Sequence, residues 1–125
     1  MAQDDHLALY DHVEFATEIA ALGRREPREF RAVLNARRML YERGSALGYP
    51  HTSAVRGSKT GFRELRPRAG RSRYRVLYRR YGDNLVLLAL AREAQTDPRD
   101  FARAVVAAER RAHDLFDPTS GDSHV

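Results

Sequence analysis

The sequence predicts an α+β domain in which two N-terminal helices pack on a small antiparallel sheet of three to four strands, followed by a C-terminal helix. Three observations lead to this prediction. Apolar residues recur at helical spacing before residue 44. They alternate, and then run continuously, between residues 62 and 91. Helical spacing returns after Pro98, so helices flank a group of strands.

The first helix is predicted over residues 11–23, with Asp11 as its N-cap and Gly23 at its end. Its apolar face is formed by Phe15, Ile19 and Leu22, which are spaced i, i+4 and i+7. The preceding residues 5–10 fit either a short strand or an extra helical turn. They therefore decide whether the sheet has three strands or four.

The second helix is predicted over residues 26–43, because Pro27 suits the first turn of a helix and Gly44 suits its end. The short link to the first helix predicts an antiparallel helical hairpin. One stripe of the second helix runs through Phe30, Val33, Leu34, Arg37, Leu40 and Tyr41. Its polar face carries the charged residues Arg25, Glu26, Arg28, Glu29, Arg31 and Arg38.

A meander of three strands is predicted in the middle of the chain. Residues 44–61 are rich in Gly and Ser and read as a long connection. Strands follow at 62–66, at 74–78, where apolar residues alternate, and at 85–90, where they run without a break. Such an unbroken run is typical of a strand buried on both sides.

The last helix is predicted over residues 98–116, with Pro98 in its first turn after Asp97. Its apolar stripe consists of Phe101, Val105, Ala108 and Ala112. We expect a single domain over residues 1–116 and a disordered tail over residues 117–125. We also expect the helices to cover one face of the sheet.

Charge is distributed unevenly along the chain. The 125 residues carry a formal net charge of +5, and 22 of them are Lys or Arg. Nine arginines and one lysine lie between Arg56 and Arg80, against the single acid Glu64. A basic block inside an otherwise mildly acidic chain indicates a polyanionic partner, most often a nucleic acid. A solvated arginine-rich face is the simpler alternative.

The alternation of the strands predicts where these arginines point. Tyr74, Val76 and Tyr78 share one face of their strand, so Arg73, Arg75 and Arg79 share the other. Pairing with the preceding strand adds Glu64 and Arg66 to this second face, which we expect to be exposed. Guanidinium groups bind phosphate in a bidentate manner. The candidate RNA-binding residues are Arg63, Arg68, Arg71, Arg73, Arg79 and Lys59.

Cleavage of RNA requires one group that takes the 2′-OH proton and another that protonates the leaving oxygen. Glu64 is either such a base or the partner of a neighbouring arginine in a cross-strand ion pair. His51 is either an acid–base group or an exposed loop histidine. Tyr49 and Tyr81 are candidates for stacking on bases. Tyr74 and Tyr78 can also stack in principle, but we expect them in the core.

Several classes of protein are disfavoured. The chain has no cysteine, which excludes disulfides and thiolate chemistry. Its histidines lack metal-ligand spacing, and we expect neither a metal nor a cofactor. No phosphate-binding loop or nucleophile elbow is present, which disfavours nucleotide hydrolysis and acyl transfer. No apolar run approaches the roughly 20 residues of a membrane helix. The acidic start lacks a secretory signal, so we expect a cytoplasmic protein.

The strand region resembles a known family. The motif Glu64-Leu65-Arg66 is followed by Tyr74-Arg75-Val76-Leu77-Tyr78, then by Leu85-Val86-Leu87-Leu88 and Gln95-Thr96-Asp97-Pro98. This order and spacing are similar to the RelE/ParE toxin superfamily, in particular its HigB-like, phage-derived branch. The similarity extends over about residues 30–112. It implies the toxin of a type II toxin–antitoxin pair, with two helices on a curved antiparallel sheet.

The resemblance also implies roles for individual residues. Arg75 matches the strand arginine that contacts the scissile phosphate in RelE-like members, and Arg66 matches a basic residue of the preceding strand. Arg92 stands at the first of two positions that are usually lysine. Glu64 stands where HigB-like members usually have Glu. These four residues, Arg75, Arg66, Arg92 and Glu64, are the candidate catalytic set.

Two positions depart from the family pattern. Glu93 reverses the charge of the second lysine position, and Leu88-Ala89 stands where a histidine is often found. Two functional hypotheses therefore stay open. The first is a ribosome-dependent mRNA endoribonuclease that is neutralised by an antitoxin, usually a helix-turn-helix protein. The second is a non-enzymatic protein on the same scaffold: a gyrase inhibitor, or a catalytically degenerate member that binds antitoxin or nucleic acid.

Overall fold

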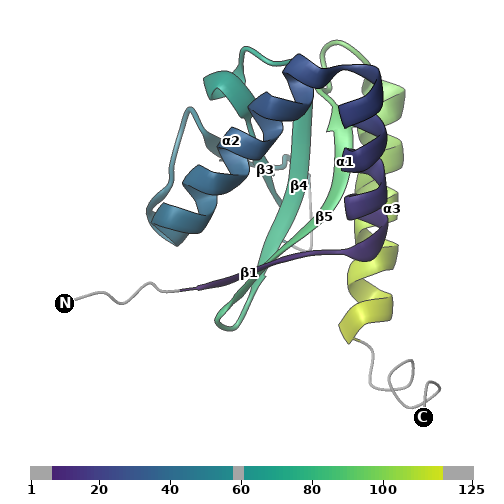
Figure 1. Ribbon diagram of the computed structural model, residues 1–125. Coiled ribbons are helices and arrows are strands. Elements are labelled where there is room, and N and C mark those ends of the chain that lie inside the picture. The colour runs from purple at the N-terminus through teal and green to yellow at the C-terminus, as the bar shows by residue number, and fades with distance from the viewer. Residues whose placement is uncertain (1–6, 58–60, 117–125) are drawn as a thin grey trace.

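The computed structural model describes residues 7–57 and 61–116. It is an α+β domain with two N-terminal helices, a five-stranded mixed sheet and a C-terminal helix packed on that sheet, which confirms the predicted fold class (Figure 1). The predicted tail and Lys59 lie outside the described residues. The elements are β1 (Ala8–Asp11), α1 (Val13–Arg25), α2 (Pro27–Arg43), η1 (Gly44–Ala46), β2 (Thr52–Ala54), β3 (Arg63–Leu65), η2 (Pro67–Gly70), β4 (Tyr74–Tyr81), β5 (Asn84–Arg92) and α3 (Pro98–Phe116).

The sheet is larger than the predicted meander. Its strand order is β1-β5-β4-β3-β2. The β3-β4-β5 meander is antiparallel as predicted, and β2 adds to it as an antiparallel edge strand. Of the segment 5–10 that was open between strand and helical turn, residues 5 and 6 lie outside the described residues, and residues 8–10 belong to a strand, β1, which pairs with β5 in parallel. The sheet is therefore mixed, because the chain passes from β1 through two helices and three strands before it reaches β5.

Both faces of the sheet are covered, and the expectation of helices on one face alone is wrong. Helices α1 and α2 pack on one face, where Phe15, Leu22 and Val33 meet Tyr74 and Val76. Helix α3 packs on the other face, where its small residues Ala104, Ala108 and Ala112 meet Leu77, Val86 and Leu88. An amphipathic helix must bury its apolar stripe, and the second face of the sheet is the apolar surface that remains.

An irregular register explains the continuous apolar run of β5. Leu77 pairs with Ala89, but the next residue of β4, Tyr78, pairs with Leu87. The bulge at Leu88 lets Leu88 and Ala89 both pack on the α3 side, while Leu87 and Leu90 pack on the α1–α2 side. The prediction of a strand buried on both faces is confirmed.

The helix boundaries follow local signals with one exception. Helix α2 has Pro27 in its first turn and ends at Gly44, and α3 begins at Pro98, as predicted. Helix α1 instead begins after His12, whose Nδ1 accepts a hydrogen bond from the Glu14 N–H at 3.1 Å. It continues past Gly23 to Arg25, and Gly23 lies in a close contact with α2, where a Cβ would lie 3.2 Å from the Phe30 ring.

Side chains complete the outer edge of β5. Strand β1 pairs only with residues 84–87. Beyond it, the Leu90 N–H donates to the Glu18 carboxylate at 3.0 Å, and the Leu88 carbonyl accepts from the Arg111 guanidinium at 2.7 Å. Arg103 donates to the Leu90 carbonyl at 3.1 Å, and the Arg92 N–H donates to Asp100 at 2.8 Å. Side chains of α1 and α3 thus replace a strand along this edge.

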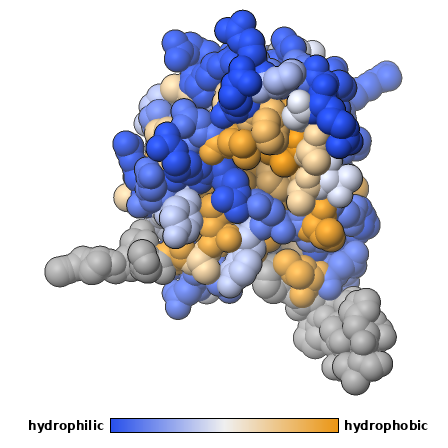
Figure 2. All heavy atoms as spheres, viewed as in Figure 1, coloured by the Kyte–Doolittle hydropathy of each residue, from blue (hydrophilic) through white to orange (hydrophobic). Residues whose placement is uncertain are grey.

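Hydrophilic side chains cover most of the face seen in Figure 2, and apolar side chains gather in a smaller central area. In the part of the chain that is described, no helix is long and apolar enough to cross a membrane.

Candidate functional site

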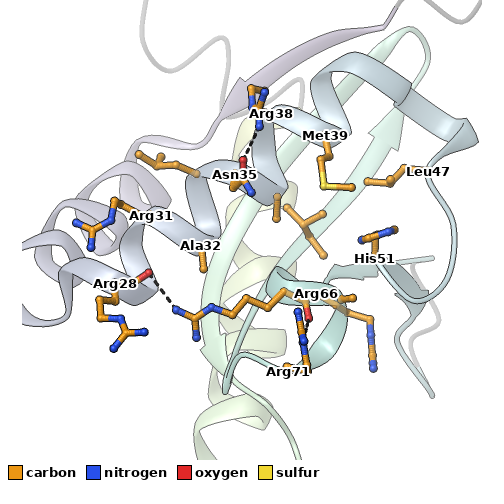
Figure 3. A pocket seen from close by; sticks show the side chains of 15 residues that line it. Arg28, Arg31, Ala32, Asn35, Arg38, Met39, Leu47, His51, Arg66 and Arg71 are labelled. Carbon is orange, nitrogen blue, oxygen red and sulfur yellow. Dashed lines mark hydrogen bonds between the residues drawn. The ribbon is translucent and has the colours of Figure 1, made fainter.

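A basic groove lies between helix α2 and the η2 turn. Its volume is about 810 Å³. We call it the α2–η2 groove. Figure 3 shows Arg28, Arg31 and Arg38 on the α2 side, with Arg66, Arg71 and His51 on the facing segments. The lining residues are Arg28, Arg31, Ala32, Leu34, Asn35, Ala36, Arg38, Met39, Leu47, His51, Leu65, Arg66, Arg68, Ala69 and Arg71.

The groove combines positive charge with apolar surface. Six of the described residues that line the groove are arginines, and no residue of this lining is acidic. Arg68 forms an ion pair with Glu29 at 3.0 Å, and Arg38 donates to Asn35 at 2.6 Å. Within residues 7–57 and 61–116, no carboxylate lies within 4.0 Å of the guanidinium groups of Arg28, Arg31, Arg66 or Arg71. The groove therefore presents a surplus of positive charge to solvent.

The η2 turn that carries part of this charge has an uncommon backbone. Arg68 and Ala69 both have φ of 55°, in the left-handed region, and Gly70 follows with φ of 92°. Each left-handed L-residue costs about 1–2 kcal/mol. Hydrogen bonds hold the turn: the Ser72 N–H donates to the Pro67 carbonyl at 3.2 Å, and the Ser72 hydroxyl donates to Glu29 at 2.6 Å. The turn thereby places Arg68 and Arg71 at the groove.

Arg75 lies beneath this turn rather than on an exposed face, which corrects the predicted arrangement. It is only 4% exposed. Its guanidinium donates to the carbonyls of Ser72 at 2.7 Å, Tyr74 at 2.9 Å and Gly70 at 3.3 Å. Burial, and next the charge of Arg66, lower the pKa of Arg75 from its usual value. The predicted face is covered because α3 packs on it and the η2 segment folds over its end.

The candidate base Glu64 is the partner of Arg75 in an ion pair of 3.2 Å. Glu93, at the position where the family has a second lysine, lies 4.0 Å from the same guanidinium. The arrangement is the cross-strand ion pair that the sequence left open as an alternative. Arg75 is thus a buried cation between two partly exposed carboxylates, Glu64 and Glu93, and it supports the η2 turn through its hydrogen bond to the Gly70 carbonyl.

The other sequence-predicted residues are divided between the groove and distant positions. The groove brings together Arg66, Arg68 and Arg71. The remaining four are engaged elsewhere. Arg63 donates a hydrogen bond to Thr52 at 2.9 Å, and the Arg79 guanidinium lies 4.9 Å from the centre of the Tyr81 ring. Two others form ion pairs: Arg73 with Glu26, and Arg92 with Asp97 at 3.6 Å. The prediction of one continuous arginine face is wrong, because α3 and local ion pairs separate these residues.

Sequence reasoning missed the contribution of α2 to the site. Arg28, Arg31 and Arg38 were assigned to a solvated polar face, yet they form one wall of the groove. Their spacing, i, i+3 and i+10, places them on one side of a helix and is the signal that could have identified the wall. Tyr74 and Tyr78 are buried in the core as expected.

The described residues contain no group of three or more His, Cys, Asp or Glu side chains able to hold a metal ion. Comparisons of the chain with protein-family models, with curated proteins and with solved structures found no match.

Proposed function

We propose that the chain is a RelE/HigB-like toxin that acts on mRNA and binds it in the α2–η2 groove. The observation that carries this proposal is the groove itself, with four arginines that lack a carboxylate partner among the described residues, beside an apolar floor. Guanidinium groups suit phosphates, and apolar surface suits the bases of an unpaired strand. The resemblance of the strand motifs to the toxin superfamily supports the same conclusion.

Cleavage would follow from chemistry that the groove can supply. Attack of a ribose 2′-OH on the adjacent phosphate forms a 2′,3′-cyclic phosphate and breaks the bond from phosphorus to the 5′ oxygen. The attacking hydroxyl needs a proton acceptor, the leaving 5′ oxygen needs a proton donor, and charge accumulates on the phosphoryl oxygens. His51 is the one imidazole among the described residues that line the groove, and Arg66 lines it too. We assign His51 to proton transfer and Arg66 to phosphate stabilisation. The proposal places the protein in the cytoplasm, with mRNA on the ribosome as its target and a helix-turn-helix antitoxin as its partner.

A second candidate is a non-enzymatic protein on the same scaffold. One observation favours it: Arg75, which matches the family's catalytic arginine, is buried and forms an ion pair with Glu64. A gyrase inhibitor, or a degenerate member that binds only antitoxin or nucleic acid, does not require these two side chains to be accessible to RNA.

The test is to induce the protein in a bacterium and map new mRNA 5′ ends after a few minutes. The groove variant Arg31→Ala/Arg71→Ala removes two exposed charges that have no ion-pair partner in the described structure. The matched control, Arg24→Ala/Arg99→Ala, removes two exposed charges away from the groove. We expect cuts within translated messages for the wild type and the control, and about tenfold fewer for the groove variant.

Binding of a single-stranded RNA oligonucleotide at several salt concentrations gives a second measurement. We expect the groove variant to bind about tenfold more weakly and with a smaller salt dependence, because two phosphate contacts are lost. Growth arrest without new cuts would favour the non-enzymatic candidate. Equal cutting by the groove variant and the wild type would reject the groove as the RNA site.

A further inference from the structure

Tyr49 and Arg66 form an exposed stack beside the α2–η2 groove. The Tyr49 side chain is 76% exposed, and the Arg66 guanidinium carbon lies 5.2 Å from the centre of its ring. An aromatic ring at such exposure gains little from packing against the protein. With Arg66 over one side of the ring, the opposite side is open to a ligand.

Arg66 is fixed in position by its surroundings. Its Nε donates to the Pro50 carbonyl at 3.0 Å, and its backbone N–H donates to the His51 carbonyl at 2.7 Å. Its Nη2 lies against Gly70, where a Cβ would approach to 2.5 Å. The guanidinium lacks a carboxylate partner among the described residues, so its charge is available to an anion. Ring and charge are thus held together as one preformed unit.

We propose that Tyr49 and Arg66 form a nucleotide subsite that takes one unstacked base of a single-stranded nucleic acid. The base stacks on the open side of the Tyr49 ring, and the adjoining phosphate contacts the Arg66 guanidinium. This subsite rests on the proposed function, in which the neighbouring groove binds RNA. It excludes duplex RNA, because a paired base is stacked between its neighbours and has no free face.

The other tyrosines do not offer an exposed ring together with a stacked arginine. Arg79 stacks on Tyr81, but that ring is partly buried against the α3-side core, and exposed Tyr10 has no arginine on its ring in the described structure. Tyr74 and Tyr78 are buried in the core. Tyr41 is 63% exposed on α2, but no arginine stacks on its ring in the described structure. Tyr41 is therefore a suitable control: it has the same side chain and similar exposure, but no stacked charge.

The experiment measures binding of a fluorescent single-stranded RNA octamer, and of the same octamer in a duplex, by anisotropy at several salt concentrations. We expect Tyr49→Ala to weaken single-strand binding by about 5- to 100-fold, the range for loss of one base–aromatic stack. The salt dependence stays unchanged, because no charge is removed. Tyr49→Phe retains wild-type affinity, as does Tyr41→Ala. Duplex binding does not change in any of these variants.

Two outcomes overturn the proposal while leaving the proposed function intact: RNA binding by Tyr49→Ala that equals the wild type, or an equal loss for single strand and duplex. Absence of RNA binding by the wild type overturns both. A second measurement needs no variant. Titration of the wild type with a dinucleotide should shift the Tyr49 ring resonances in NMR spectra and leave those of Tyr41 unmoved, and the opposite result rejects the subsite.

Discussion

Arginines at two ends of this molecule behave in opposite ways. On α3, Arg103, Arg110 and Arg111 each lie against a carboxylate of α1 or α3, and we call them the braced arginines. In the α2–η2 groove, Arg28, Arg31, Arg66 and Arg71 lack such a partner among the described residues. Arg103 and Arg111 hold α3 to the sheet and Arg110 holds α3 to α1, whereas the groove arginines leave their charge available to a ligand. Neighbouring carboxylates, not the arginines themselves, make this difference.

The largest loss of stability is expected from a substitution among the braced arginines. Arg111 is buried and bridges Glu18 at 2.7 Å and the Leu88 carbonyl at 2.7 Å. Arg111→Ala leaves both acceptors without their cation, and we expect it to lower the free energy of unfolding by about 3 kcal/mol. Urea denaturation measures this loss. The control Arg110→Ala removes an exposed ion pair and should cost markedly less, because solvent screens such a pair. Equal losses for the two variants would contradict the distinction between them.

A smaller effect is expected at the groove. Gly70→Ala forces an alanine into φ of 92° and brings its Cβ to within 2.5 Å of the Arg66 Nη2. We expect a stability loss of about 1–3 kcal/mol from the backbone alone. RNA binding weakens as well, and its salt slope falls by about 1, because Arg66 is displaced.

The matched control for this prediction is Gly82→Ala. Gly82 also has a positive φ, of 60°, but a Cβ there meets nothing within 4 Å. This variant should therefore lose stability and keep wild-type RNA binding. If both variants bind RNA normally, Arg66 does not depend on Gly70 for its position.

The smallest effect is a dependence of stability on pH, which should arise beside the braced arginines, at His12 and Glu14. Burial lowers the pKa of the His12 imidazole below its usual 6.5, so the neutral ring that caps α1 is favoured on folding. The unfolded chain binds this proton more readily, so stability should fall as the pH drops below 6.5. The hydrogen bond from Arg110 lowers the pKa of Glu14 from 4.5, so a second loss should begin near that pH.

Thermal unfolding between pH 7.5 and 4 measures this dependence. The variant His12→Asn retains a capping side chain without a titrating group, and we expect it to lose the first step and keep the second. Arginines stay charged throughout this range, so the charge that the arginines give the groove should not change. An unchanged first step in His12→Asn would mean that another group titrates there.

The elements that could be predicted are those with a long apolar pattern or with a proline or glycine at their ends. Pro27, Gly44 and Pro98 marked the helix ends because they restrict the backbone locally. Strand β2 has only three residues, Thr52–Ala54, which is too short for an alternating pattern to emerge. The parallel pairing of β1 depends on partners more than 70 residues away along the chain, and no local signal encodes it.

The candidate site was predictable in composition but not in place. Alternation correctly separated Arg75 from Tyr74 and Val76, since consecutive strand residues face opposite ways. It did not reveal that α3 and the η2 segment cover that side, so Arg75 was expected to be exposed. The groove also joins α2 to residues some 40 positions later, and only the tertiary fold brings Arg31 and Arg71 to one surface.

The side-chain caps along β5 have a consequence beyond the stability of a single molecule. An uncapped strand edge is a template on which another chain can add a strand, and such addition leads to aggregation. Glu18, Arg111, Arg103 and Asp100 occupy the hydrogen-bonding groups of Leu88, Leu90 and Arg92, so this stretch offers no vacant position to an incoming strand. Arg103, Arg111 and the carboxylates Glu18 and Asp100 therefore also limit the growth of the sheet and help to keep the chain from polymerising through this edge.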